Sequence, residues 1–113
     1  MKGTDLENLN WVARGPVHVV NLWGDNSGES AFLLKIGPDF EGGKHIHSEN
    51  YHGVTLQGTW LKTWGDGKVE KFPVGSYLMQ PKNKWHGDAC AGPETCIFFI
   101  HFEGPRDITM IGG

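Results

Sequence analysis

Residues 42–54, GGKHIHSENYHGV, place three of the chain's six histidines and one of its two tyrosines within eight positions. His45 and His47 are separated by one residue, and side chains two apart on an extended strand point to the same side. Both imidazoles would then face one surface, as chelation of a single ion requires, and neutral imidazole is a common ligand of transition metals. The stretch therefore predicts a metal site on a strand, and it leaves open which of the following polar side chains completes that site.

Short segments rich in β-branched and aromatic residues recur on both sides of this stretch, separated by Gly, Pro, Asn or Asp. This pattern is typical of an all-β sandwich or barrel. The predicted strands cover residues 17–23, 30–36, 44–47, 52–57, 59–64, 68–73, 76–80, 84–90 and 95–102. The Gly-Asp-Gly segment at 65–67 tolerates positive φ and predicts a tight hairpin. Because so many short strands leave edges to protect, we expect two antiparallel sheets closed into a small barrel or jelly roll.

The length of 113 residues suits one compact domain spanning 1–113, since two domains would each be too small to bury a core. We expect the barrel core to span residues 30–102. Residues 1–16 precede it as an N-terminal arm or edge strand. Within this segment, residues 4–13 form either a short helix with Thr4 as its N-cap or an extended arm.

Charge and hydropathy exclude several classes of partner. The net charge is −3 and the basic residues are scattered, so we expect no binding of nucleic acid or of an anionic membrane surface. No apolar run approaches the ~20 residues of a membrane helix, and the first ten residues lack the apolar core of a signal peptide. The chain as it stands is expected to be cytoplasmic.

The two cysteines leave a second possibility open for the compartment. Cys90 and Cys96 are separated by the turn-like spacer AGPET, which can bring facing strand positions to disulfide distance. The alternative is two buried free thiols, since cysteine packs as a small hydrophobe. A disulfide would indicate the mature part of an exported, periplasmic protein.

A second stretch, residues 75–86 (GSYLMQPKNKWH), predicts a strand, a turn at PKN and a strand near His86. Together with His45 and His47 some forty residues earlier, it resembles the two sequence motifs of the cupin superfamily. The resemblance covers roughly residues 30–102, with both motifs in the family's order. It implies a small single-domain cupin, an all-β double-stranded β-helix or jelly-roll barrel of short antiparallel strands, with the three histidines as metal ligands.

The departures from the cupin motifs bear on the site. Tyr51 stands where the first motif places a glutamate, and Gly58 matches the glycine that ends that motif. In the second motif Asn83 replaces a glycine, but asparagine tolerates left-handed backbone and the turn is expected to survive. Cys90 stands where an asparagine often follows. The loss of the glutamate leaves the three histidines as the expected ligand set.

Strand parity decides between the two residues that follow the histidine pair. It places Tyr51 on the side of His45, and His52 on the opposite side. A phenol with a pKa near 10 ligates poorly, so Tyr51 is expected to act as a hydrogen-bond donor or general acid/base beside the metal. A bulge after His47 would reverse the parity and make His52 a fourth ligand. Glu49 is expected to be a solvated loop residue.

His101 has two possible positions. Residues 95–102, TCIFFIHF, present one wholly apolar face, and the other face carries His101. The ending IHFEGPRDITMI is similar to the tail of a group of small cupins, and this resemblance implies that His101 lies in the pocket as an acid/base group. The alternative is that the apolar face forms the core and His101 lies outside, at a subunit interface.

Three neutral imidazoles leave at least one coordination position open, which is the layout of a catalytic metal site. Three histidines suit zinc, iron, nickel or copper, and manganese stays open although it prefers more oxygen ligands. The leading hypothesis is an enzyme acting on a small oxygen-bearing organic molecule by dioxygenase, lyase or isomerase chemistry. The alternatives are a non-catalytic binding or sensor cupin and a structural sandwich with incidental histidines.

Substrate and partners are less well defined by the sequence. Arg14 and Arg106 are the chain's two arginines and lie outside both motifs, so no bidentate clamp for a carboxylate or phosphate is evident. Cupins commonly pair through their sheets, and the many apolar strand faces agree with this, so we expect a homodimer that binds a small molecule.

Overall fold

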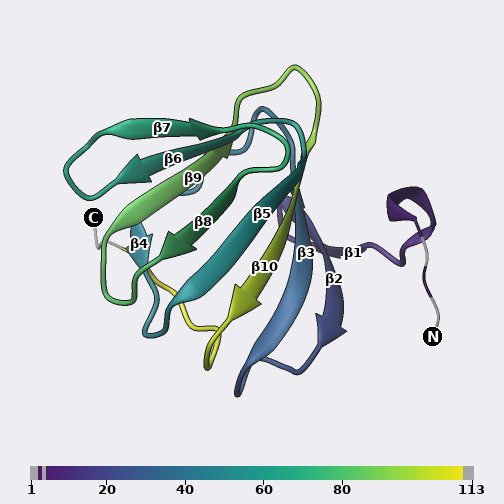
Figure 1. The fold of residues 1–113 in the computed structure, drawn as a ribbon, viewed down its shortest axis with the longest axis horizontal. Coiled ribbons are helices and arrows are strands. Elements are labelled where there is room, and N and C mark those ends of the chain that lie inside the picture. The colour runs from purple at the N-terminus through teal and green to yellow at the C-terminus, as the bar shows by residue number, and fades with distance from the viewer. Residues whose placement is uncertain (1–2, 4, 111–113) are drawn as a thin grey trace.

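The computed structural model describes residue 3 and residues 5–110 of the chain. Two antiparallel sheets face each other across a buried core (Figure 1). The larger sheet has the strand order β1-β2-β3-β10-β5-β8 and the smaller has the order β11-β4-β9-β6-β7. The strands are β1 (Val12–Arg14), β2 (Val17–Trp23), β3 (Ser30–Ile36), β4 (His45–Ile46), β5 (Tyr51–Gln57), β6 (Trp60–Trp64), β7 (Val69–Phe72), β8 (Tyr77–Gln80), β9 (His86–Cys90), β10 (Cys96–Phe102) and β11 (Thr109–Met110). This architecture confirms the predicted all-β jelly-roll barrel.

Every strand predicted from the sequence is present, with ends that differ by one or two residues at most. The predicted hairpin at 65–67 joins β6 to β7, where the Trp64 amide donates to the Lys68 carbonyl at 2.8 Å and Gly67 has a φ of 88°. β11 was not predicted. It pairs with β4, with Met110 opposite His45, so the end of the described chain lies beside the first histidine of the HxH pair.

The N-terminal region contains one short helical turn followed by an edge strand. β1 pairs with β2 at the edge of the larger sheet. Before it, η1 (Leu6–Asn8) is one turn of 3-10 helix, and Asp5 caps it by accepting from the Asn8 amide. Thr4, the N-cap suggested by the sequence, lies outside the described residues. No helix in the described part of the chain has the length and apolar composition to cross a membrane.

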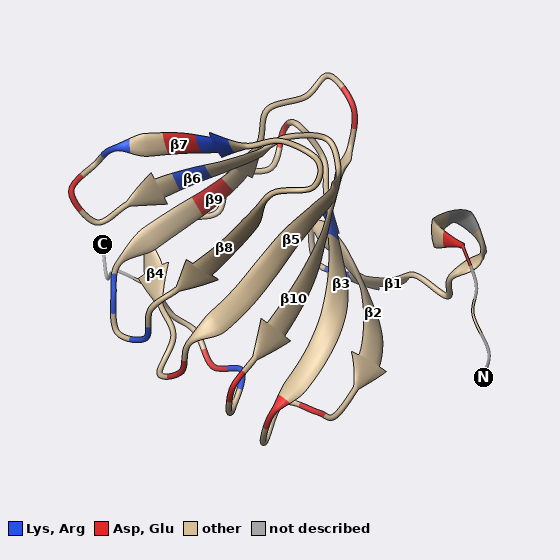
Figure 2. Cartoon of the chain, in the orientation of Figure 1, with Lys and Arg blue, Asp and Glu red and all other residues tan. Residues whose placement is uncertain are grey.

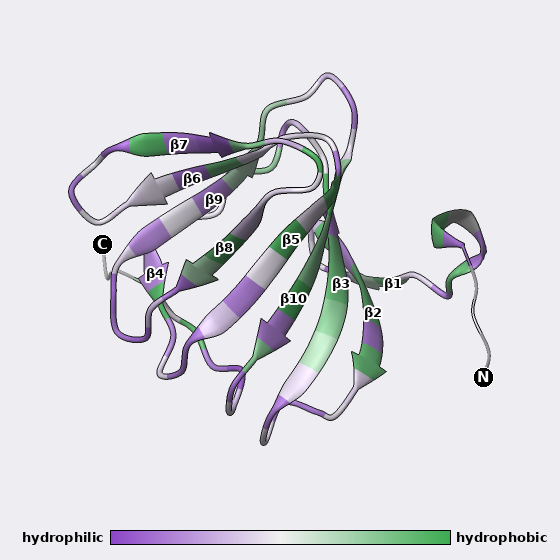
Figure 3. Ribbon diagram, in the orientation of Figure 1, coloured by the Kyte–Doolittle hydropathy of each residue, from purple (hydrophilic) through white to green (hydrophobic). Residues whose placement is uncertain are grey.

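The core lies between the sheets and is built largely by the alternation of β10. Phe98, Ile100 and Phe102 are buried and point inward, and Figure 3 shows hydrophobic segments along β10 and its neighbour β3. Trp60 of β6 stacks on Phe98 with ring centroids 4.1 Å apart. Its ring lies so close to β5 that a Cβ at Gly53 would be 2.6 Å from it. Glycine at this position therefore lets the indole fill the centre of the barrel.

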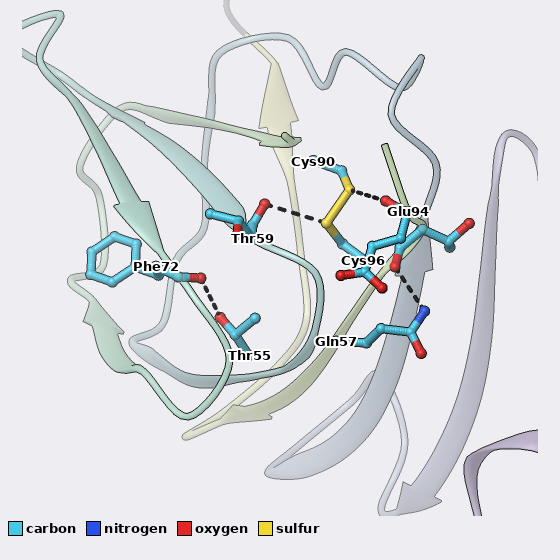
Figure 4. The surroundings of a disulfide bond; sticks show 8 residues. Thr55, Gln57, Thr59, Phe72, Cys90, Glu94 and Cys96 are labelled. Carbon is cyan, nitrogen blue, oxygen red and sulfur yellow. Dashed lines mark hydrogen bonds between the residues drawn. A yellow bond between two sulfur atoms is a disulfide. The ribbon is translucent and has the colours of Figure 1, made fainter. Parts of the chain in front are cut away.

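Cys90 and Cys96 form a disulfide between the end of β9 and the start of β10 (Figure 4). The Thr59 carbonyl lies 3.3 Å from the Cys96 sulfur, and Gln57 donates to the Thr95 carbonyl at 2.8 Å. The bond therefore ties the two sheets together at the end of the barrel, and both cysteines are buried. It meets the condition that the sequence set for an exported protein, while the compartment itself stays a prediction.

Candidate metal centre

Three histidines from distant parts of the sequence meet on the inner face of the smaller sheet. His45 opens β4, His86 opens β9, and the two are direct partners across the antiparallel pair. His47 follows β4 and its ring centroid lies 4.9 Å from that of His45. One nitrogen of each ring lies within 4.8 Å of the other two, and His45 and His86 are buried. The predicted ligands His45, His47 and His86 therefore form one cluster that can hold a metal.

Backbone carbonyls fix the orientation of all three rings. Nδ1 of His45 lies 2.7 Å from the Gly43 carbonyl, and Nδ1 of His86 lies 3.0 Å from that of Lys84. Nδ1 of His47 lies 2.5 Å from the carbonyl of Asp107. A carbonyl only accepts, so each Nδ1 carries a proton, and in the neutral form of each ring Nε2 is the nitrogen that keeps its lone pair. This is the outer hydrogen bonding that metal-binding histidines normally show.

The Nε2 atoms of the three histidines make no hydrogen bond within the described part of the chain. Nε2 of His86 is fully buried and makes no hydrogen bond, a state that leaves the desolvation of a polar atom uncompensated. Burial, followed by the nearby Lys62 ammonium, lowers the pKa of His86 to about 3. Burial also lowers the pKa of His47. These two rings are neutral at pH 7, as metal ligation requires, so the donor set fits a divalent transition metal.

Tyr51 and His52 lie on opposite faces of β5, as strand parity predicted. Tyr51 is 3% exposed and faces inward, with its ring centroid 5.5 Å from that of His47. His52 faces the outside of the barrel, where it hydrogen-bonds Tyr77 at 2.7 Å and Glu103 at 2.5 Å. Residues 47–50 form a loop between β4 and β5 rather than a bulged strand, and it is Tyr51 that faces the histidine cluster. His52 is therefore not a fourth ligand.

His101 lies on the outside of the larger sheet, which is the second of the two positions that the sequence left open and not the pocket position that the cupin resemblance implied. The apolar face of β10 forms the core, so alternation turns His101 outward. Its Nε2 lies 3.1 Å from a Glu29 carboxylate oxygen, and its ring stacks on His52 with centroids 5.8 Å apart. An acid/base role at the metal centre therefore does not follow from its position.

Two charged residues beside the histidines were not predicted from the sequence. Lys62 on β6 and Asp88 on β9 are paired across the strands, and Figure 2 shows the basic segment of β6 next to the acidic segment of β9. Nζ of Lys62 lies 3.0 Å from Oδ1 of Asp88 and also donates to the hydroxyl of Tyr51. The Lys62 side chain is fully buried. Strand parity could have found it, since Trp60 and Lys62 must share the inward face of β6.

A cavity of about 480 Å³ opens beside this centre. Its walls are mostly apolar and come from both sheets, and His47 and Tyr51 lie among its lining residues. Arg106 also lines it, with its guanidinium 4.3 Å above the Phe32 ring. The volume lies in the range of sites that bind small organic molecules, and the cavity gives such a molecule a path to the histidines.

Solved structures share this fold over nearly the whole chain. KdgF from Halomonas sp. is 16% identical, with 94% of this chain and 96% of that chain covered and a TM-score of 0.73. The polyketide cyclase RemF from Streptomyces resistomycificus is 18% identical, with 99% and 86% covered and a TM-score of 0.79. An RmlC-like cupin from Shewanella frigidimarina is 19% identical, with 91% and 89% covered and a TM-score of 0.73. At these identities the likeness shows the fold alone.

The chain therefore has the fold of small cupins together with a buried histidine cluster, which confirms the fold that the sequence resemblance implied. It belongs to the family described as Domain of unknown function (DUF4437), whose model matches residues 8–108. A comparison with curated proteins gives no match.

Proposed function

We propose that this cupin is a metal-dependent enzyme that acts on a small oxygen-bearing organic molecule by proton transfer, as a lyase or an isomerase. The observation that carries the proposal is the convergence of three imidazoles whose Nδ1 atoms are all held by carbonyls. A divalent metal bound there would polarise a substrate oxygen as a Lewis acid. The cavity beside it would hold the rest of the substrate.

Tyr51 is the residue that favours proton transfer over oxygen chemistry. Lys62 donates to the Tyr51 oxygen, so the hydrogen of the Tyr51 hydroxyl is free to be donated to a ligand. Burial and the Asp88 carboxylate raise the pKa of Tyr51 well above its usual value, which keeps the phenol protonated at neutral pH. When Tyr51 gives up its proton, the Lys62 ammonium is in place to stabilise the phenolate.

The proposal is tested by loading the protein with Zn²⁺, Fe²⁺, Mn²⁺, Ni²⁺ or Cu²⁺ and incubating each form with small ketones, 2-oxo acids and 3-hydroxy acids in D₂O. Proton-transfer chemistry predicts incorporation of deuterium next to the carbonyl, followed by NMR. Uptake of oxygen without incorporation would point to dioxygenase chemistry instead. A protein that binds metal and ligands but converts none of them would be a binding or sensor cupin, and one that binds no metal would contradict both interpretations.

Tyr51→Phe is expected to lower the rate of deuterium incorporation by about 10²- to 10⁴-fold, the range for loss of a general acid or base. Phenylalanine preserves the ring that stacks against Trp60, so the affinity for metal should change little. Tyr77→Phe, which removes a hydroxyl on the outer face, is the matched control. An unchanged rate in Tyr51→Phe would remove Tyr51 from the mechanism.

Arg106 is expected to favour ligands that carry a carboxylate. Its Nε and Nη2 donate to neutral oxygens, those of Ser30 at 2.5 Å and Asn21 at 2.6 Å. No carboxylate lies within 4.0 Å of Arg106 among the described residues. The guanidinium at the cavity wall therefore has no carboxylate at contact distance, although the charge of Asp25 acts on it from farther away. A charged hydrogen bond from Arg106 to a ligand contributes about 1.5–3 kcal/mol.

Monohydroxamates of dicarboxylic acids with four to eight carbons test this, because the hydroxamate binds a metal and the far carboxylate probes Arg106. At one chain length, Arg106→Gln should weaken binding by about tenfold, while binding of the corresponding methyl ester should not change. Asn21→Ala removes one partner of Arg106 but leaves its charge, so this control should keep the preference for the acid. Equal binding of acid and ester by the wild type would rule out a carboxylate role.

A further inference from the structure

Asp88 lies beside the Nε2 atoms of two histidines of the cluster, His45 and His86. It follows His86 by two residues on β9, so both side chains point to the same side of the strand. Its Oδ2 is 3.7 Å from Nε2 of His45 and also 3.7 Å from Nε2 of His86. Two ligand atoms of one ion, each about 2.0–2.2 Å from it, are separated by about this distance.

The two oxygens of Asp88 have different partners. Oδ1 accepts from Nζ of Lys62 at 3.0 Å and from Nε1 of Trp60 at 2.9 Å. Oδ2 has no hydrogen bond within the part of the chain that the structure describes, and it is the oxygen that faces the imidazoles. Lys62 and Trp60 therefore orient the carboxylate so that one oxygen is left for another partner.

Potential metal ligands meet at this point. Nδ1 of His45 and Nδ1 of His86 each donate to a backbone carbonyl, so in the neutral rings the Nε2 atoms present lone pairs toward the carboxylate oxygen. The Lys62 ammonium lies 3.0 Å from the other oxygen of Asp88 and offsets the charge of the carboxylate in the buried site. A divalent cation placed among the two Nε2 atoms and Oδ2 would accept electron pairs from all three.

We infer that Asp88 is the fourth protein ligand of the metal centre. It supplies from β9 the carboxylate that the cupin motif would supply at the position of Tyr51. The inference rests on the proposed metal site and adds a charged oxygen donor to its three nitrogens. A site of three imidazoles and one carboxylate suits Zn²⁺, Fe²⁺, Ni²⁺ or Mn²⁺ and disfavours Cu⁺, which prefers sulfur ligands. Tyr51 is thereby left free of the metal, for proton transfer.

The test compares Zn²⁺ binding by wild type and Asp88→Asn in calorimetry at pH 7. Asparagine keeps an oxygen that can accept from Lys62 and Trp60. Loss of the charged ligand should weaken zinc binding by about 100-fold or more, because losing even a residue that only hydrogen-bonds to a metal ligand weakens binding by up to about that much. Glu41→Gln is the matched control, because Glu41 also lines the cavity and its loss removes the same charge. This control should bind zinc within about twofold of wild type.

A crystal structure of the zinc-loaded wild type provides a second measurement that does not depend on the variant folding. A distance of about 2.0–2.2 Å between zinc and Oδ2 of Asp88 supports the inference, and a distance beyond 3 Å overturns it. If zinc is held by the three histidines alone, and Asp88→Asn binds zinc with the same affinity as Glu41→Gln, the role of Asp88 is refuted and the proposed function still stands. No zinc binding by the wild type would refute both.

Discussion

His86→Ala is expected to lower the affinity for a divalent metal by at least about 100-fold and to remove the stabilisation that the metal gives. His86 is the ligand most completely enclosed by the barrel, and its Nε2 has no other partner. At a free metal concentration of 100 times the wild-type Kd, binding should raise the free energy of unfolding by about 2.7 kcal/mol. The variant should show almost none of this gain, measured by urea denaturation with and without Zn²⁺.

His52→Ala is the matched control, because it removes the same side chain from the outer face of β5. His52 contacts Tyr77 and Glu103 rather than the cluster, so this variant should keep the metal-dependent gain in full. If His52→Ala lost the metal-dependent increase in the free energy of unfolding and His86→Ala kept it, the metal would bind elsewhere on the barrel. The proposed centre would then be wrong.

The motif histidines and the strands were predictable because each depends on local pattern. Period-two alternation puts Tyr51 and His52 on opposite sides of one strand, as β5 shows. The inward side was counted from His45, and this part of the prediction was right although β4 and β5 are separate strands in different sheets. The turn of the second motif also followed from local chemistry, since Asn83 has a φ of 58° in the position of a glycine. Features of this kind need no knowledge of what lies across the barrel.

Alternation puts Lys62 on the side of Trp60 and Asp88 on the side of His86, but the contact between Lys62 and Asp88 depends on pairing between strands, which the sequence does not state. Lys62 and Asp88 meet because β6 pairs with β9 in one register, and a shift by one residue would turn either outward. Arg106 reaches the cavity from the segment after β10, through hydrogen bonds to Ser30 and Asn21. For His101, alternation gave the right side, and the resemblance to other small cupins favoured the wrong one.

Lys62→Met is expected to destabilise the metal-free protein by about 3–5 kcal/mol, the usual effect of removing one partner from a buried ion pair. Methionine fills a similar volume but leaves the Asp88 carboxylate, which is 17% exposed, without its cation. Urea denaturation at pH 7 in the presence of a chelator measures the change. Zn²⁺ should restore part of the lost stability, because the bound cation would take over the neutralisation of Asp88.

The double variant Lys62→Met with Asp88→Asn separates charge from packing. If the loss in Lys62→Met comes from the unpaired carboxylate, the double variant should be more stable than Lys62→Met, with a coupling energy of at least about 1 kcal/mol. Additive losses would mean that Lys62 acts through its hydrogen bond to Tyr51 and its packing beside Trp60 instead. Since the barrel keeps a fully buried lysine where an apolar side chain would pack, coupling would indicate that Lys62 is retained to hold Asp88 toward the histidines.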